Sequence, residues 1–169
     1  MVGQAVAAIT LLLLGASGMA KAVDPDPTSG ALRAAGLPSS RLVSRSLGVT
    51  ELTAALLGLS AAAMALIPAA VLYAGFTIFT LTAIRGRIPV QSCGCFGRVD
   101  TPPSLIHVVY NASATLFLVW VAINGTTPFP WNASTLEILL FAVFAILGAY
   151  ASYLVLARLP IALHPTGRP

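Results

Sequence analysis

The sequence predicts an all-α integral membrane protein, a transmembrane helical bundle of about five spans. Apolar residues make up 57% of the chain and charged residues only 8%, and the mean hydropathy is +0.91. A soluble domain typically carries about 25% charged residues. Long uncharged stretches recur along the chain, each close to the roughly 20 residues that a helix needs to cross a bilayer. These observations exclude a soluble enzyme, a disordered tail and a protein that binds nucleic acid.

The first span is predicted over residues 1–20, which contain no charge. A cleaved signal peptide is the alternative, because Ala20-Lys21-Ala22 has the small-x-small pattern of a cleavage site. However, no lysine or arginine precedes the apolar run, as the start of a signal peptide requires. We therefore expect the segment to be retained as a span, followed by a loop with one short helix on the membrane surface.

Two spans are predicted to cover the next uncharged stretch, residues 52–84, the first of them beginning a few residues before it. At about 1.5 Å per residue, this stretch is too long for one crossing. Pro68 lies in its middle, where a proline breaks a helix or starts a new one. We therefore predict a second span over residues 47–67 and a third over residues 69–84, joined by a tight turn.

The fourth span is predicted over residues 105–123 and the fifth over residues 136–157. Both stretches have the length and apolar composition of a crossing helix. Glu137, near the start of the fifth, is the only acidic residue in either of them.

The basic residues indicate how the chain is oriented. All nine lysine and arginine residues fall in the first loop, the third loop and the C-terminal tail, which five alternating spans place on one side of the membrane. Because cytoplasmic loops are enriched in basic residues, we expect a multi-pass plasma membrane protein with its N-terminus outside and its C-terminus in the cytoplasm. These residues are Lys21, Arg33, Arg41, Arg45, Arg85, Arg87, Arg98, Arg158 and Arg168.

The chain has two cysteines, Cys93 and Cys95, separated by Gly94 in the polar third loop. A disulfide across one residue closes a very small, strained ring, and strain makes a disulfide more oxidising. Gly94 best tolerates the backbone that such a ring demands. The neighbouring arginines, Arg98 among them, favour a thiolate. The pattern favours a redox-active dithiol. A purely structural disulfide and a soft-metal site built from Cys93, Cys95 and His107 are the alternatives.

Ionisable residues are predicted to share the membrane face of the cysteines. Glu51 is expected near the start of the second span, His107 near the start of the fourth, and Lys21 at the end of the first. Ionisable groups at membrane depth are costly and often functional. Glu51 and His107 are therefore candidates for proton handling, and Arg98 for tuning a thiolate. Glu51 could also pair with Lys21 or an arginine. The alternatives are an interfacial ion pair for Glu51, a satisfied interfacial imidazole for His107 and a snorkelling anchor for Lys21.

At Cys93-Gly94-Cys95-Phe96-Gly97 the sequence resembles the MauE family of methylamine utilisation membrane proteins, within the DoxX-like group. The resemblance extends over residues 2–123, so we divide the chain into a four-helix core at residues 1–123 and an additional helix with a short tail at residues 124–169. Softer matches are Ser17-Gly18-Met19-Ala20-Lys21, Ala31-Leu32-Arg33-Ala34-Ala35-Gly36-Leu37-Pro38, Gly48-Val49-Thr50-Glu51-Leu52 and Arg85-Gly86-Arg87.

The resemblance implies a membrane protein of thiol–disulfide exchange that supports the maturation or redox balance of a partner, with a thioredoxin-fold protein beside it. With one cysteine pair the chain cannot relay electrons between pairs, so they pass to a quinone, to another protein or back to the partner. No nucleotide or flavin motif is visible, and a quinone is the one cofactor that we consider. Two expectations conflict here. Disulfides are inserted outside the cytoplasm, whereas the charge pattern predicts that Cys93 and Cys95 lie on the cytoplasmic side.

Two other functions stay open at this point. The chain could bind or transport a soft metal or a small thiol, or it could be a non-catalytic subunit or assembly factor that contacts other membrane subunits.

Overall fold

Every element is a helix in the part of the chain that the computed structural model describes, namely residues 2–59, 62–86, 102–125, 127–130 and 132–163. The elements in chain order are α1 (Val2–Val23), α2 (Asp26–Ala34), α3 (Arg41–Gly58), the short 3-10 helix η1 (Ala63–Leu66), α4 (Ile67–Ile84), α5 (Leu105–Ile123) and α6 (Thr135–Leu163). The all-helical bundle expected from the sequence is confirmed.

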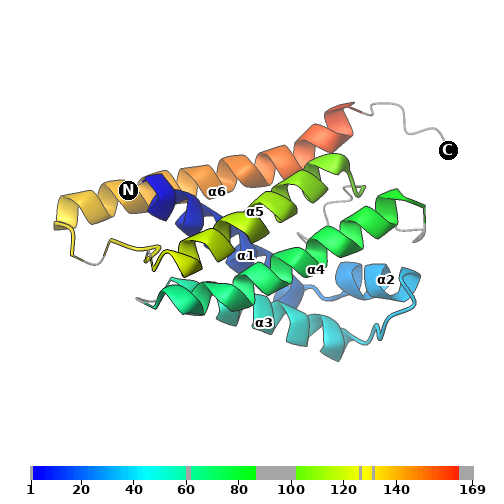
Figure 1. The fold of residues 1–169 in the computed structure, drawn as a ribbon. Helices are drawn as coiled ribbons and strands as arrows, with labels where there is room; N and C mark the ends of the chain where they lie inside the picture. The colour runs from blue at the N-terminus through cyan, green and yellow to red at the C-terminus, as the bar shows by residue number, and fades with distance from the viewer. Residues whose placement is uncertain (1, 60–61, 87–101, 126, 131, 164–169) are drawn as a thin grey trace.

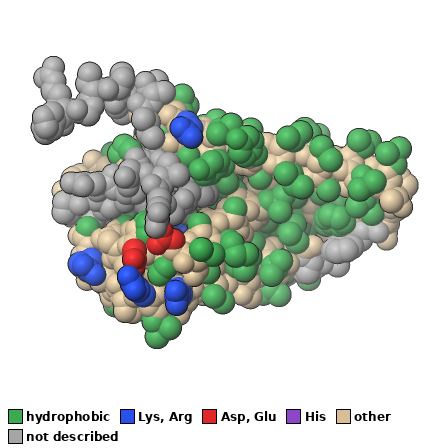
Figure 2. Space-filling view, turned by 180° about the vertical axis from the view of Figure 1, so that it is seen from behind, with side chains coloured by type: hydrophobic (Ala, Val, Ile, Leu, Met, Phe, Trp, Pro, Cys, Tyr) green, Lys and Arg blue, Asp and Glu red, His purple; other side chains and the backbone are tan. Residues whose placement is uncertain are grey.

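The five long helices run lengthwise between two ends of the bundle (Figure 1). We call one of them the basic end: there α1, α4 and α6 finish, α3 and α5 begin, and α2 is located. At the opposite end α3 turns into η1, and α5 connects to α6. Lys and Arg side chains gather at the basic end, while hydrophobic side chains cover most of the remaining length (Figure 2).

Four helical segments have the length and composition of a membrane crossing. They are Val2–Val23, Ala63–Ile84, Leu105–Ile123 and Thr135–Pro160. They correspond to the first, third, fourth and fifth predicted spans, and the boundaries of α5 agree with the prediction. The protein is therefore a multi-pass membrane protein.

The second predicted span differs from its helix in the structure. The structure places this helix, α3, at Arg41–Gly58 and not at residues 47–67. The Ser40 hydroxyl accepts a hydrogen bond from the Val43 amide, 3.2 Å away, which caps the helix at this earlier start. With Arg41, Arg45 and Glu51 along it, α3 is too charged to be among the four apolar crossings. Its exposed residues Leu42, Val49 and Leu56 nevertheless recur every two turns, which suits a face against lipid.

The predicted turn at Pro68 is also wrong. The third predicted span begins with η1 at Ala63, and Pro68 lies in the first turn of α4. Proline is tolerated there because the first amides of a helix have no partner inside it. The chain therefore reverses before Ala63, several residues earlier than predicted.

Helix α1 is the central element and the most buried of the four apolar segments. It packs along α3 on one side and along α6 on the other, while α4 pairs with α5 (Figure 1). Small residues permit close approach: a Cβ added at Gly58 would meet Leu11, and one at Gly148 would meet Ile9. This is the packing expected in lipid, where helices associate through close contact rather than through the hydrophobic effect.

Candidate functional site

A buried ion pair joins α1 to α3 near the basic end. The Lys21 ammonium donates to the Glu51 carboxylate, and Nζ lies 2.9 Å from Oε2. The Lys21 side chain is 3% exposed and that of Glu51 is fully buried. Sequence analysis expected Glu51 near the start of a span and Lys21 as a snorkelling anchor. The structure confirms Lys21, one of the partners predicted for Glu51, and corrects both positions, because α3 begins earlier than predicted and the two side chains meet inside the bundle.

Two glycines set the spacing that allows this pair to form. Gly18 of α1 and Gly48 of α3 face each other so closely that a Cβ on Gly48 would lie 2.6 Å from the Gly18 carbonyl oxygen. A Cβ on Gly18 would lie 2.5 Å from the Gly48 carbonyl oxygen. Because the two helices run in opposite directions, each charged residue lies against the glycine of the other helix: a Cβ on Gly48 would lie 2.9 Å from the Lys21 Cβ, and one on Gly18 would lie 3.0 Å from the Glu51 Cβ. The close contact therefore brings the ammonium and the carboxylate together.

The Lys21 ammonium has further partners inside the bundle. Nζ lies 2.5 Å from the Ser17 hydroxyl, one turn earlier on α1, and 5.4 Å from the centre of the Phe76 ring on α4. A cation within about 6 Å of a ring centre is attracted by the ring electrons. Three helices thus hold one ammonium group. Ser17 was not predicted as a site residue, although its spacing of four from Lys21 places the two on the same helix face.

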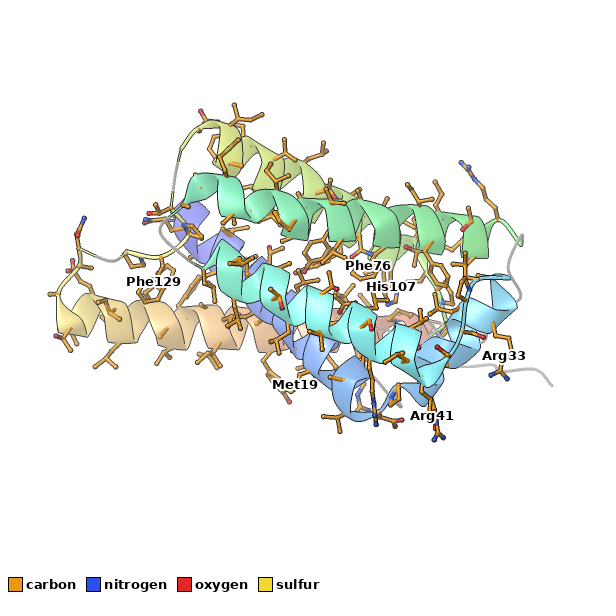
Figure 3. All side chains as sticks on the ribbon, turned by 90° about the horizontal axis from the view of Figure 1, so that it is seen from below. Met19, Arg33, Arg41, Phe76, His107 and Phe129 are labelled. Carbon is orange, nitrogen blue, oxygen red and sulfur yellow. The ribbon has the colours of Figure 1, made fainter. Side chains whose placement is uncertain are left out.

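His107 lies in the first turn of α5, at the basic end of the bundle. Its ring is 4% exposed, and Nδ1 lies 2.8 Å from the hydroxyl of Ser104, which precedes the helix. The imidazole lies between the helices near Phe76, whereas Arg33 and Arg41 point outward from the same end (Figure 3). The expected position of His107 near the start of a span is confirmed.

A small cavity of about 30 Å³ lies between His107 and Ser17, the residue whose hydroxyl contacts the Lys21 ammonium. Ser17 contributes to its wall from α1, and His107, Tyr110 and Asn111 contribute from α5. The Tyr110 hydroxyl is buried and has no hydrogen-bond partner among the described residues, and the same holds for Oε1 of Glu51. Neither Tyr110 nor Asn111 was predicted as a site residue, since single polar residues in an apolar stretch carry no distinctive pattern.

A larger pocket of about 260 Å³ lies between α2, α3 and α4. Its lining is apolar except for Lys21 and Thr28, and it includes the rings of Phe76 and Phe79. A Cβ added at Gly75, also on its wall, would meet nothing within 4 Å. The pocket therefore has room for an apolar group beside the buried ion pair.

The predicted redox residues Cys93, Cys95 and Arg98 lie outside the described residues. They belong to the chain segment that joins the end of α4 to the start of α5, and both of these helix ends lie at the basic end. The proposed metal ligands Cys93 and Cys95 are likewise outside the described part. Within that part, no group of three His, Cys, Asp or Glu side chains could hold a metal ion.

A family model described as methylamine utilisation protein MauE matches residues 1–124. The match covers the bundle as far as the end of α5 and confirms the resemblance carried by the cysteine motif and its neighbours. No curated protein and no solved structure gives a significant match.

Proposed function

The chain belongs to the MauE family of methylamine utilisation proteins, and from this premise we propose that it exchanges disulfides with a partner protein through Cys93 and Cys95. The observation that carries the proposal is the Cys-Gly-Cys pair. It contains the only cysteines in the chain and lies in the connection between two helix ends at the basic end. The exchange supports the maturation or the redox balance of that partner.

Each exchange conserves electrons and atoms. A partner thiolate attacks one sulfur of the Cys93–Cys95 disulfide, the bond between the two cysteines breaks, and the second cysteine leaves as a thiolate. A second partner thiol then displaces the mixed disulfide. The partner now holds the disulfide, and two electrons and two protons are on Cys93 and Cys95. Arg98 favours the thiolate that leaves, because a nearby positive charge lowers the free energy of the anion.

The pair regains its disulfide by passing two electrons to an oxidant. We propose the disulfide of a thioredoxin-fold protein, for which the reaction is the same exchange in reverse. A membrane quinone is the second candidate, reduced to a quinol as the dithiol becomes a disulfide. The apolar pocket of about 260 Å³ beside Phe76 and Phe79 favours this candidate, because it offers aromatic walls within the bundle.

Glu51 and His107 are proposed to handle the protons that thiol chemistry releases and takes up. Both are buried at the basic end, where the cysteine-bearing segment starts and finishes. Buried ionisable groups in a membrane protein are costly, and they are usually retained for function.

Trapping of the mixed disulfide tests the proposal. Cells that produce the full-length protein with Cys93→Ser or Cys95→Ser are treated with an alkylating reagent, and complexes are separated without reductant. One single variant should accumulate a covalent complex with a partner, because the cysteine that resolves it is missing. The complex should disappear on reduction and be absent from the variant that lacks both cysteines.

Ser92→Ala is the matched control, since it alters the same segment and leaves both sulfurs in place. It should behave like the natural protein. The proposal is wrong if neither single variant traps a partner, and equally if the double cysteine variant supports function as well as the natural protein does.

A further inference from the structure

Two buried oxygen atoms in the polar part of the bundle have no hydrogen-bond partner within the part of the chain that the structure describes. They are the Tyr110 hydroxyl, in a residue on the wall of the cavity of about 30 Å³, and Oε1 of Glu51 in the ion pair beside it. A buried polar atom without a partner costs about 1–3 kcal/mol. Native proteins usually satisfy such atoms with ordered water.

The cavity has the size and the chemistry that water needs. A water molecule requires roughly 10–15 Å³ of such space and two to four polar partners. The wall of this space of about 30 Å³ is mostly apolar, and hydroxyl, imidazole, phenol and amide groups interrupt it at Ser17, His107, Tyr110 and Asn111. An entirely apolar cavity of this size would stay dry, whereas this one offers several hydrogen bonds.

We infer that this cavity binds water, and that the bound water carries protons between His107 and the Lys21–Glu51 pair. Ser17 connects the two, because it forms part of the cavity wall and its hydroxyl also contacts the Lys21 ammonium at 2.5 Å. The ammonium contacts the Glu51 carboxylate in turn at 2.9 Å. Polar groups thus follow one another from the start of α5 to the buried carboxylate.

Proton movement along this route leaves the charge of every intervening group unchanged. Because an ammonium has no lone pair, Lys21 first releases a proton to Glu51, and the neutral amine then accepts one from the Ser17 hydroxyl. Ser17 in turn takes one from the water, and the water takes one from the imidazolium of His107. Each intermediate donates one proton for the one it accepts, so only the two ends change. The use of these protons in thiol chemistry rests on the proposed function, whereas binding of water does not.

Among the described residues, the polar groups of the route lie toward the basic end of the bundle. Between the cavity and the opposite end the interior is filled by fully buried apolar side chains, including Leu11, Leu66, Leu118 and Val121. Tyr73 closes the polar part, with its hydroxyl donating to the Thr10 carbonyl oxygen at 2.8 Å. The carboxylate therefore exchanges protons with the basic end and not across the membrane.

The composition of the chain permits a direct test. Lys21 is its only lysine, and His107 is one of two histidines. The full-length protein is labelled with the heavy nitrogen isotope in lysine and histidine, with His164→Gln to leave one histidine signal, and is placed in lipid nanodiscs. Solid-state NMR then measures how fast magnetisation passes from water to each nitrogen. We expect rapid transfer to Lys21 and His107 although both are buried. Absence of transfer to Lys21 would overturn the inference.

Three variants identify the route of the water. Asn111→Leu replaces a polar wall group with an apolar one of similar size and should reduce transfer to Lys21 by at least half. Asn124→Leu, the same change at the exposed far end of α5, should leave transfer unchanged. Gly75→Leu fills the larger pocket, which also borders Lys21, and should have no effect. Loss with Gly75→Leu but not with Asn111→Leu would place the water in the larger pocket and overturn the route.

Replacing both cysteines by serine separates this test from the proposed function. Transfer to Lys21 and His107 should be the same in that variant, because the route runs through Ser17 and His107 and needs no thiol chemistry. Protein that shows rapid transfer but traps no partner would retain the hydrated cavity and lose the proposed exchange. The reverse result would retain the exchange and reject the cavity.

Discussion

Lys21 and Glu51 are the residues whose environment departs most from expectation. A charge in lipid or in an apolar core is expensive, and the attraction between two buried charges seldom exceeds the cost of removing both from water. The pair is therefore weak support for stability in itself. Once it is buried, however, each member depends on the other.

Glu51→Gln should destabilise the protein strongly. The variant keeps the shape of the side chain but leaves the Lys21 ammonium buried without its counter-charge, which typically costs about 3–5 kcal/mol. The measurement is the thermal or SDS-induced unfolding of purified protein in detergent micelles. Combining Glu51→Gln with Lys21→Met should recover much of the loss, since no charge then stays buried.

Asp26→Asn is the control for this prediction. It breaks the ion pair that Asp26 makes with Arg41, whose N–O distance is 2.7 Å but whose side chains are 57% and 73% exposed. Exposed pairs contribute little to stability, so this variant should unfold much like the natural protein. If Glu51→Gln and Asp26→Asn lowered the stability of the protein equally, burial of the Lys21–Glu51 pair would not be the cause of the effect.

At the scale of the elements, the contact between α1 and α3 determines where the site forms. The contact depends on two glycines whose missing side chains let the backbones touch. Because the obstructing atoms are backbone oxygens, the neighbour cannot move aside at little cost.

Gly48→Ala should therefore force the two helices apart. A Cβ 2.6 Å from the Gly18 carbonyl oxygen must be relieved by a backbone shift, and overpacking of this kind costs about 1–3 kcal/mol. The unfolding assay used for Glu51 also measures this effect. The separation should in addition change the rate of magnetisation transfer to Lys21.

Gly75→Ala is the matched substitution, because its Cβ would meet no atom within 4 Å. It should be neutral or slightly stabilising, since alanine favours a helix by about 1 kcal/mol over glycine. If both alanine variants unfolded alike, the helix contact would not be the cause.

The sequence predicts the bounds of α5 correctly and those of α3 incorrectly, and both outcomes have a physical reason. Helix α5 was placed correctly because its apolar run starts after two prolines and ends at Asn124-Gly125, where Gly125 has a φ of +68°. The predicted second span begins later than α3 because it starts only after Arg45. Arginines on an exposed helix face do not end a helix, and Arg41 and Arg45 are both exposed.

The candidate site was predicted in part for a similar reason. Glu51, His107 and Lys21 were recognised because ionisable residues are rare in this chain. The pairing of Lys21 with Glu51, 30 positions apart, depends on the register of two packed helices, which no local pattern records. Tyr110 and Asn111 become site residues only through the cavity between helices.

At the scale of the whole molecule, charge and polarity are concentrated at one end. Every described lysine and arginine lies at or near the basic end, from Lys21 and Arg33 to Arg85 and Arg158. The buried polar groups lie toward the same end, and the opposite end has an apolar interior. By the positive-inside rule we expect the basic end to face the cytoplasm.

Cysteine labelling tests this orientation. In a background without Cys93 and Cys95, a membrane-impermeant maleimide is applied to intact cells that carry Arg33→Cys, Arg85→Cys, Ala62→Cys or Asn132→Cys, all at exposed positions. The first two should react only after lysis, and the last two should react in intact cells. Reaction at Ala62 also shows that α3 crosses the membrane, because this position follows it directly.

Labelling at Arg33→Cys in intact cells would invert the orientation. Labelling at Asn132→Cys but not at Ala62→Cys would mean that α3 does not cross. Each result leaves the helices in place and changes only how they are set in the bilayer.

Lys21 is the only lysine and is buried in the bundle, so its chemical modification can also serve as a probe of local opening of the fold. An amine-reactive reagent can modify its side chain only when α1 and α3 separate, since the ammonium is otherwise enclosed and paired. The rate of modification at this one position, followed by mass spectrometry, thus measures how often the two helices part in a native membrane. A bound partner that holds the bundle closed would slow the rate of Lys21 modification. Binding of the partner could therefore be detected without an engineered label.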